Sequence, residues 1–225
     1  MEESDPLPQK LRVYEEPQVA ASYDRRWAGR RGRRRDARKL RALRRGLTLL
    51  AEAAGETPRS VLDAPCGTGR FLGALASDGL VVVGADLAAP MLTEARRKHP
   101  AATLVRADQL RLPFADDAFD AAACIRFLHL VRDPTLRVAF LRELGRVARL
   151  GVVVDYRHAH TVRNAGRRLR HRLGLLPRPP ATPTFAELRA ELEAADLDVL
   201  ALVRVRPIPW TTDKVLAVAT AATNT

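Results

Sequence analysis

The sequence has few cysteines, few aromatic residues and no long apolar run. Two of its 225 residues are cysteines, and the spacing of Cys66 and Cys124 suits neither a disulfide framework nor a metal site. No run of about 18 apolar residues is present, and the N-terminus lacks the basic-then-apolar order of a secretory signal. We therefore expect a cytoplasmic protein that binds no metal.

Acidic residues are in the minority, and the charges are unevenly distributed. The formal net charge is +12 and the pI is near 10.9. Residues 25–45 hold twelve Lys or Arg against the single Asp36, and residues 157–178 hold seven Arg and no acid. The remainder is mildly acidic. Two basic segments of this kind suit an anionic partner, either RNA or a membrane surface, although 34 of the 38 basic residues are Arg and a compositional bias would produce part of the excess.

The length fits one domain with short appendages. Residues 1–20, with three prolines among charges, predict a flexible N-terminal tail, and residues 21–225 predict a single domain. Within that domain, residues 21–56 are a basic helical region, where leucines recur at helical spacing from Arg38 to Gly55. Residues 157–183 are longer than a usual connection and predict a basic insertion or lid.

Short apolar runs alternate with helical patterns from residue 61 onward. The runs predict strands over 61–64, 80–85, 103–105, 119–125 and 152–156, with helices over 71–76, 89–98 and 136–148 between them. This alternation predicts an α/β fold, Rossmann-like and doubly wound, with a mostly parallel sheet. A helix over 185–195 precedes runs over 199–205 and 215–221, whose short connection predicts an antiparallel C-terminal hairpin and a seven-stranded sheet.

The sharpest local motif reads VLDAPCGTGRF, from Val61 to Phe71. An acid ends a buried strand, and a glycine turn then opens a helix. Gly67 and Gly69 permit positive φ and close approach of the backbone to a ligand, and open α/β sheets bind ligands at the carboxyl ends of their strands. The motif lacks the third glycine of a nicotinamide fingerprint and the Lys-Ser/Thr pair of a phosphate loop. It predicts a cradle for another small molecule.

Four ordered motifs resemble those of class I S-adenosylmethionine-dependent methyltransferases, in the group that includes the ubiquinone and menaquinone biosynthetic enzymes. Asp63 with Gly67 and Gly69 resembles the first motif, and residues 83–92, which contain Asp86, resemble the second. Residues 106–120 resemble the third motif, and residues 127–134 resemble the loop after the fourth strand. The resemblance implies an enzyme with S-adenosylmethionine as its cofactor.

The resemblance also implies roles for individual residues. Asp86 would accept hydrogen bonds from ribose hydroxyls, Asp108 would meet the adenine amino group, and Asp63 would orient the cationic methionine part. Leu87 and Met91 would flank the adenosine, and an Arg near the N-terminal helix would pair with the methionine carboxylate. The implied cofactor-binding set is Tyr23, Asp63, Ala64, Gly67, Thr68, Gly69, Asp86, Leu87, Met91, Ala107, Asp108 and Gln109.

His129 and Arg126 are the candidate catalytic residues. Methyl transfer from a sulfonium needs mainly alignment and dehydration, so a base is optional. His129 is the candidate base because an ordinary imidazole pKa of about 6.5 suits proton removal from a phenol or enol. A packing role for this histidine is an equal alternative. Arg126 would line the same mouth and hold an anionic or carbonyl-bearing acceptor.

The predicted acceptor is a small or lipid-like molecule. The exit of the fourth strand reads CIRF instead of the Asn/Asp-Pro-Pro-aromatic motif of amino methyltransferases, and Cys66 lies in the glycine loop, where a cytosine-type nucleophile is not expected. Two other functions stay open: an RNA methyltransferase that holds phosphates with its basic segments, and a cofactor-binding module without catalysis. Whether the acceptor is a small molecule or RNA, we expect both basic segments near the ligand edge of the sheet.

Overall fold

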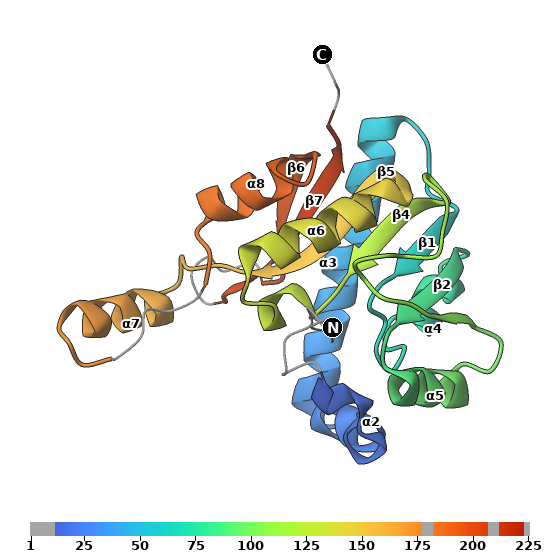
Figure 1. Ribbon diagram of the computed structural model, residues 1–225, viewed down its shortest axis with the longest axis horizontal. Coiled ribbons are helices and arrows are strands. Elements are labelled where there is room, and N and C mark those ends of the chain that lie inside the picture. The colour runs from blue at the N-terminus through green and yellow to red at the C-terminus, as the bar shows by residue number, and fades with distance from the viewer. Residues whose placement is uncertain (1–11, 177–181, 207–211, 223–225) are drawn as a thin grey trace, which may run out of the picture.

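The computed structural model describes residues 12–176, 182–206 and 212–222 and contains one seven-stranded sheet of order β3-β2-β1-β4-β5-β7-β6 (Figure 1). The strands are β1 (Ser60–Asp63), β2 (Val81–Asp86), β3 (Thr103–Arg106), β4 (Phe119–Cys124), β5 (Ala148–Arg157), β6 (Leu197–Arg204) and β7 (Lys214–Ala221). Strands β1 to β5 pair in parallel, and β7 runs antiparallel to both β5 and β6. The predicted Rossmann-like sheet with its antiparallel C-terminal hairpin is confirmed.

Helices cover both faces of the sheet. They are α2 (Pro17–Tyr23), α3 (Arg30–Ala54), α4 (Leu72–Ser77), α5 (Ala89–Lys98), α6 (Pro134–Arg146), α7 (Val162–Arg172) and α8 (Phe185–Glu193), with the 3-10 turns η1 (Val13–Glu15), η2 (Asp24–Trp27) and η3 (Leu128–Leu130). On one face, α3 buries its leucine stripe against the sheet, and Gly46 lets it approach so closely that an added Cβ would lie 2.8 Å from Val153. On the other face, α6 and α8 pack their apolar sides together.

Local signals explain where these helices begin and end. Asp133 caps α6 by accepting the Thr135 N–H at 2.9 Å, and Pro134 fits the first turn because its missing N–H is not needed there. Thr184 and Glu187 form a capping box at the start of α8. Gly55 ends α3 with φ of +70°.

The N-terminal residues differ from the predicted flexible tail over 1–20. Residues 13–23 form η1 and α2, with Pro17 in the first helical turn. Ala20 is only 2% exposed and packs with Ala88 and Met91 of the α5 region. An apolar contact made across more than sixty residues of sequence orders this segment, which is why local composition did not predict it. Residues 1–11 lie outside the described residues.

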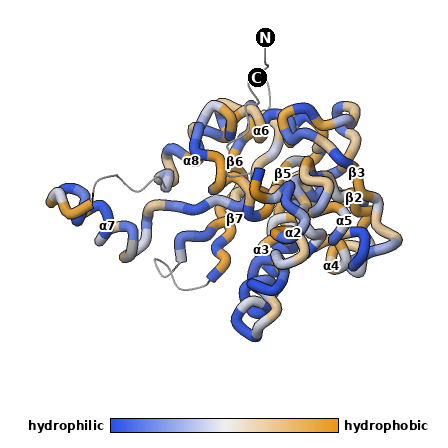
Figure 2. Tube along the Cα trace, turned by 60° about the horizontal axis from the view of Figure 1, so that its bottom comes forward, coloured by the Kyte–Doolittle hydropathy of each residue, from blue (hydrophilic) through white to orange (hydrophobic). Residues whose placement is uncertain are grey.

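The two basic segments take different forms. Helix α3 begins at Arg30, ahead of the leucine pattern that starts at Arg38. In the predicted insertion over 157–183, helix α7 projects away from the body of the molecule in both views (Figures 1 and 2). Val162 and Leu169 on this helix are exposed. Residues 177–181 of the predicted insertion lie outside the described residues.

Candidate active site

A cleft of about 110 Å³ opens at the carboxyl ends of the parallel strands. Asp63 enters it from the end of β1, Asp86 from the end of β2, and Asp108 from the segment after β3. Arg126 follows β4 and lines the same cleft. The order of the sheet thus gathers side chains that are widely separated in sequence, as expected at the switch point of an open α/β sheet. We refer to this cavity as the glycine-loop cleft.

Two buried carboxyls form the floor of the glycine-loop cleft. Burial raises the pKa of Asp63 to about 8, and the neighbouring Asp86 adds to the shift. Burial also raises the pKa of Asp86 to about 6, although this carboxylate accepts the N–H groups of Gly67 at 2.7 Å and Ala88 at 2.9 Å. Because no described residue pairs a cation with Asp63, a cationic ligand group beside it would be strongly favoured.

The two glycines of the loop have different roles. Gly67 has φ of +56° and lines the cleft, and no atom lies within 4 Å of the position that a Cβ would take. Gly69 has φ of +72°, but its Cβ would lie 3.0 Å from Leu72 Cδ1 and 3.1 Å from Ala95 Cβ. Gly67 therefore keeps space open for a ligand, whereas Gly69 permits packing of α4 against α5.

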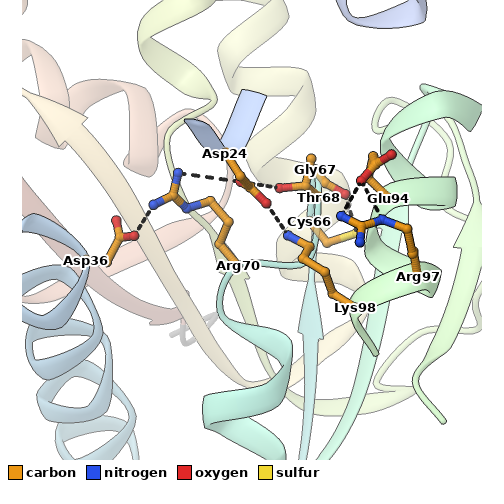
Figure 3. Close-up of polar contacts among 9 residues, drawn as sticks. All are labelled: Asp24, Asp36, Cys66, Gly67, Thr68, Arg70, Glu94, Arg97 and Lys98. Atoms are coloured by element: carbon orange, nitrogen blue, oxygen red, sulfur yellow. Dashed lines mark hydrogen bonds and ion pairs between the residues drawn. The ribbon is translucent and has the colours of Figure 1, made fainter. Parts of the chain in front are cut away.

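Two acids hold the N-terminal segment over the glycine loop (Figure 3). Asp24 accepts a hydrogen bond from Thr68 Oγ1 at 2.9 Å and pairs with Lys98 of α5. Asp36 of α3 pairs with Arg70, next to the loop, and with Arg126. These contacts link residues 24–36 to three separate elements around the cleft. We call Asp24 and Asp36 the N-terminal clamp.

Arg70 and Arg126 stack on Trp27, with guanidinium carbons 4.7 Å and 4.1 Å from the ring centroid. The Nη1 atom of each arginine is buried without a hydrogen-bond partner among the described residues. Both arginines line the glycine-loop cleft, where guanidinium groups suit a ligand carboxylate, and Arg70 Nη1 also pairs with Asp24 Oδ1 at 3.7 Å. The sequence argument missed Arg70. A cationic residue directly after the glycine turn was the available signal.

Most of the predicted cofactor set lines the glycine-loop cleft, whereas three members do not. Those on the cleft wall are Tyr23, Asp63, Gly67, Thr68, Asp86, Leu87, Met91, Asp108 and Gln109. Ala64 and Ala107 are buried beside the wall, and Gly69 faces the α4–α5 packing. Asp108 Oδ1 accepts the Leu110 N–H at 2.9 Å, which fixes the carboxylate at the turn after β3.

A side chamber of about 150 Å³ adjoins the cleft. It shares Tyr23 and Arg126 with the cleft, and His129 and Asp155 form more of its wall. Burial lowers the pKa of His129 to about 4, and the Arg157 charge lowers it further. The imidazole is therefore neutral near pH 7 and is a weaker base than the ordinary value of about 6.5 implied.

Arg126 stands where the cleft and the side chamber meet. Its φ of +66° is in the left-handed region, which is strained for a residue with a Cβ. Its backbone N–H donates to Asp155 Oδ2 at 3.2 Å, and Asp155 also pairs with the buried Lys39 at 2.5 Å. The strained backbone is thus held by a buried ion pair that connects β5 to α3.

Comparison with known proteins supports the resemblance. Residues 61–151 match the family model of a methyltransferase domain. The demethylmenaquinone methyltransferase of Beutenbergia cavernae is 40% identical over 101 residues, which are 44% of this chain and 41% of that protein. A malonyl-(acyl-carrier protein) O-methyltransferase of Pseudescherichia vulneris is 38% identical over 108 residues, 48% of this chain and 42% of that protein. The chain spans about two fifths of the length of these curated relatives.

A likeness of fold extends over nearly the whole chain. The magnesium protoporphyrin IX methyltransferase of Synechocystis, solved with bound SAH, aligns with a TM-score of 0.66 at 16% identity, covering 94% of this chain and 98% of that one. Residues 61–151 thus match a methyltransferase domain, and the motifs and the sheet order resemble those of class I S-adenosylmethionine-dependent methyltransferases. Within this class, the chain resembles the demethylmenaquinone methyltransferases of quinone biosynthesis.

The residues of the cleft fit this cofactor in chemistry. The buried carboxyls suit its cationic ammonium and sulfonium groups, the two guanidinium groups suit its carboxylate, and Gly67 leaves open space. Arg12, Tyr14 and Glu15 form part of the cleft wall, so the N-terminal segment borders the ligand space.

The described residues contain no group of three or more His, Cys, Asp or Glu side chains placed to hold a metal ion. Among the described helices, none is both long and apolar enough to cross a bilayer. Cys66 and Cys124 are free and buried, and burial raises the pKa of both thiols.

Proposed function

We propose that this protein transfers the methyl group of S-adenosylmethionine to a small-molecule or lipid-like acceptor held in the side chamber. The observation that carries the proposal is that the two cavities adjoin, with Tyr23 and Arg126 lining both. Methyl transfer requires donor and acceptor to lie in line at van der Waals distance, and adjoining cavities allow that alignment.

Each part of the cleft has a proposed task. Bound S-adenosylmethionine supplies a methyl group activated by its sulfonium. Asp86 accepts hydrogen bonds from the ribose hydroxyls, Asp63 faces the cationic methionine part, and Asp108 meets the adenine amino group. Arg70 and Arg126 offer their guanidinium groups to the methionine carboxylate. The N-terminal segment excludes water from the site.

The side chamber favours an acceptor that reacts as an anion. Arg126, Arg157 and Lys214 line it and would lower the pKa of an acceptor hydroxyl. The acceptor hydroxyl would lose its proton to solvent or to the neutral His129 before it attacks the methyl carbon, and S-adenosylhomocysteine would leave as the bond between sulfur and the methyl carbon breaks. The aromatic side chains of Tyr23 and Trp27 suit a planar ring, which agrees with the quinone precursors named for the relatives.

Titration calorimetry with S-adenosylhomocysteine tests the cofactor assignment. Asp86→Ala removes the ribose acceptor and should weaken binding about tenfold or more. Asp198→Ala is the matched control, because Asp198 is an exposed acid on the edge strand β6. Unchanged affinity in Asp86→Ala, or no binding by the wild type, would refute the assignment.

Methyl-labelled S-adenosylmethionine, incubated with small-molecule, lipid and RNA fractions in parallel, tests the acceptor class. We expect label in the small-molecule or lipid fraction. Label only in RNA would replace the proposal with the alternative in which the basic segments hold nucleic-acid phosphates. Absence of transfer to all three fractions, with cofactor binding intact, would favour a binding module without catalysis.

A further inference from the structure

A third cavity, of about 380 Å³, adjoins the side chamber. Arg126, Arg157 and Lys214 line both the cavity and the chamber, so the three cavities lie next to one another in turn. Among the described residues, its wall contains eight basic residues and a single acid, Asp213. The basic residues are Arg35, Arg38, Lys39, Arg126, Arg157, Arg167, Arg206 and Lys214. We call this the basic cavity.

Most of this charge is not neutralised by acids of the protein. Within the described residues, Arg35, Arg38, Arg167 and Arg206 form no ion pair, and Arg157 reaches Asp213 only at 4.0 Å. Several arginines elsewhere are paired closely, as Arg146 is with Glu143 at 2.6 Å. Burial lowers the pKa of Lys214, and the positive charge of Lys39 contributes to the shift. Like charges held together in this way are stabilised by an anion between them.

The basic cavity is assembled from distant parts of the chain. Arg35 and Arg38 come from α3, Arg157 ends β5, and Arg167 lies on α7. Arg206 follows β6 on the remaining side. A compositional excess of arginine would scatter such residues over the surface, and it does not explain their convergence from four elements on one hollow.

An uncharged donor completes the wall. Thr182 Oγ1 is buried, has no hydrogen-bond partner among the described residues, and belongs to a residue of the basic cavity. Guanidinium forks and a hydroxyl together match a compact group with several acceptor oxygens, and a phosphoryl dianion presents such a group.

We propose that the basic cavity binds a phosphoryl group of the methyl acceptor and so selects phosphate-bearing acceptors. This inference rests on the proposed function for the location of the acceptor, but the anion site itself does not depend on it. Among the described residues, no aromatic side chain lines the basic cavity to stack a base, and this favours a compact phosphoryl group over a single-stranded RNA.

Binding of inorganic pyrophosphate to the full chain tests the proposal, with saturating S-adenosylhomocysteine present. We expect one saturable site by calorimetry. Arg38→Gln combined with Arg167→Gln should weaken it about tenfold or more, because each change removes a charge-assisted donor. The matched control combines Arg41→Gln and Arg170→Gln, which remove equal charge from exposed positions on the same two helices outside the cavity. The control should stay within about twofold.

Two further probes distinguish the source of the phosphoryl group. Vesicles containing phosphatidylglycerol that bind the wild type and lose binding in the cavity variant, but not in the control, would support a lipid head group as the source. Pyrophosphate binding with the same selectivity, without vesicle binding, would support a soluble phosphate ester. An RNA oligomer bound equally weakly by both variants, without a saturable pyrophosphate site, would overturn the proposal in favour of a diffuse basic surface.

Other outcomes also decide the matter. No pyrophosphate binding by the wild type, or equal losses in the cavity variant and the control, overturns the proposal. Thermal unfolding of each variant verifies that it is folded. Failure of the wild type to bind S-adenosylhomocysteine would refute the proposed function, whereas a pyrophosphate titration repeated without that ligand would still report on the anion site.

Discussion

At the scale of single residues, Gly67 and Gly69 separate ligand binding from folding. Gly67→Ala adds a methyl group in the open space of the cleft, at a left-handed φ of +56°, so we expect S-adenosylhomocysteine affinity to fall about tenfold or more. Gly69→Ala meets Leu72 and Ala95 at 3.0–3.1 Å, so we expect about 1–3 kcal/mol of lost stability. Calorimetry and urea unfolding on both variants measure the contrast. If both variants lost affinity and stability in the same proportion, the two glycines would not have the different roles proposed here.

His129 tests how far methyl transfer depends on a base. Because the pKa of His129 is about 4, the histidine contributes no inflection to the rate near its ordinary value of about 6.5. We expect His129→Ala to lower kcat several-fold with the identified acceptor, while S-adenosylhomocysteine affinity stays within about twofold. His129→Gln keeps a hydrogen-bonding side chain without a basic nitrogen. Full activity in His129→Gln would assign a positioning role, and a wild-type inflection near 6.5 that disappears in both variants would contradict the low pKa.

At the scale of elements, the N-terminal segment forms part of the cleft wall, and Asp24 holds it there. Asp24→Ala removes the contacts with Thr68 and Lys98, so we expect faster hydrogen exchange over residues 13–27 and weaker cofactor binding. Saturating S-adenosylhomocysteine should slow exchange over the same residues in the wild type. Asp78→Ala is the control, since Asp78 pairs with Arg44 on the surface away from the cleft. Exchange unaffected by both the ligand and the Asp24 change would show that the segment is not part of the site.

Local patterns predicted the elements that local interactions determine. The apolar runs and the glycine turn carry their own periodicity, so the strands and the loop of Asp63 and Gly67 were predicted close to where they lie. Helix α3 starts earlier than its leucine pattern. Its first turns depend on Asp36, which pairs with Arg70 and Arg126, and on Gly32, where a Cβ would lie 2.1 Å from the Trp27 carbonyl oxygen.

The same reason explains what sequence reasoning missed in the site. The proximity of Arg70 and Arg126 to Trp27, and the depressed pKa of His129, arise only when β4, β5 and α3 are assembled. The expectation that both basic segments lie near the ligand edge came from their positions relative to the strands. Arg38 and Arg167 do meet in one cavity, next to the side chamber. Lys214 also lines that cavity, and no local sequence pattern predicted a role for it.

At the scale of the whole molecule, the cleft makes folding stability depend on pH. Asp63 and Asp86 have raised pKa values, about 8 and about 6, so the folded state retains protons that the unfolded chain releases near pH 4. Their contribution to stability therefore falls as the pH rises toward those values. His129, with its pKa lowered to about 4, has the opposite effect between about 4 and 6.5, because the unfolded chain then binds the extra proton. Above about pH 6.5, Asp63 is the one of these three groups that still makes the unfolding free energy change with pH.

We therefore expect the unfolding free energy of the cofactor-free protein to fall by roughly 1–2 kcal/mol between about pH 6.5 and pH 8, from the linkage slope of about 1.4 kcal/mol per pH unit for one proton. Urea unfolding at both pH values measures it. Asp63→Asn cannot ionise and should remove most of this slope, while Asp198→Asn on the exposed edge strand should retain it. A wild type with no slope in this range, or an Asp63→Asn variant with the full slope, would show that Asp63 is already ionised in the free protein and that its burial is compensated.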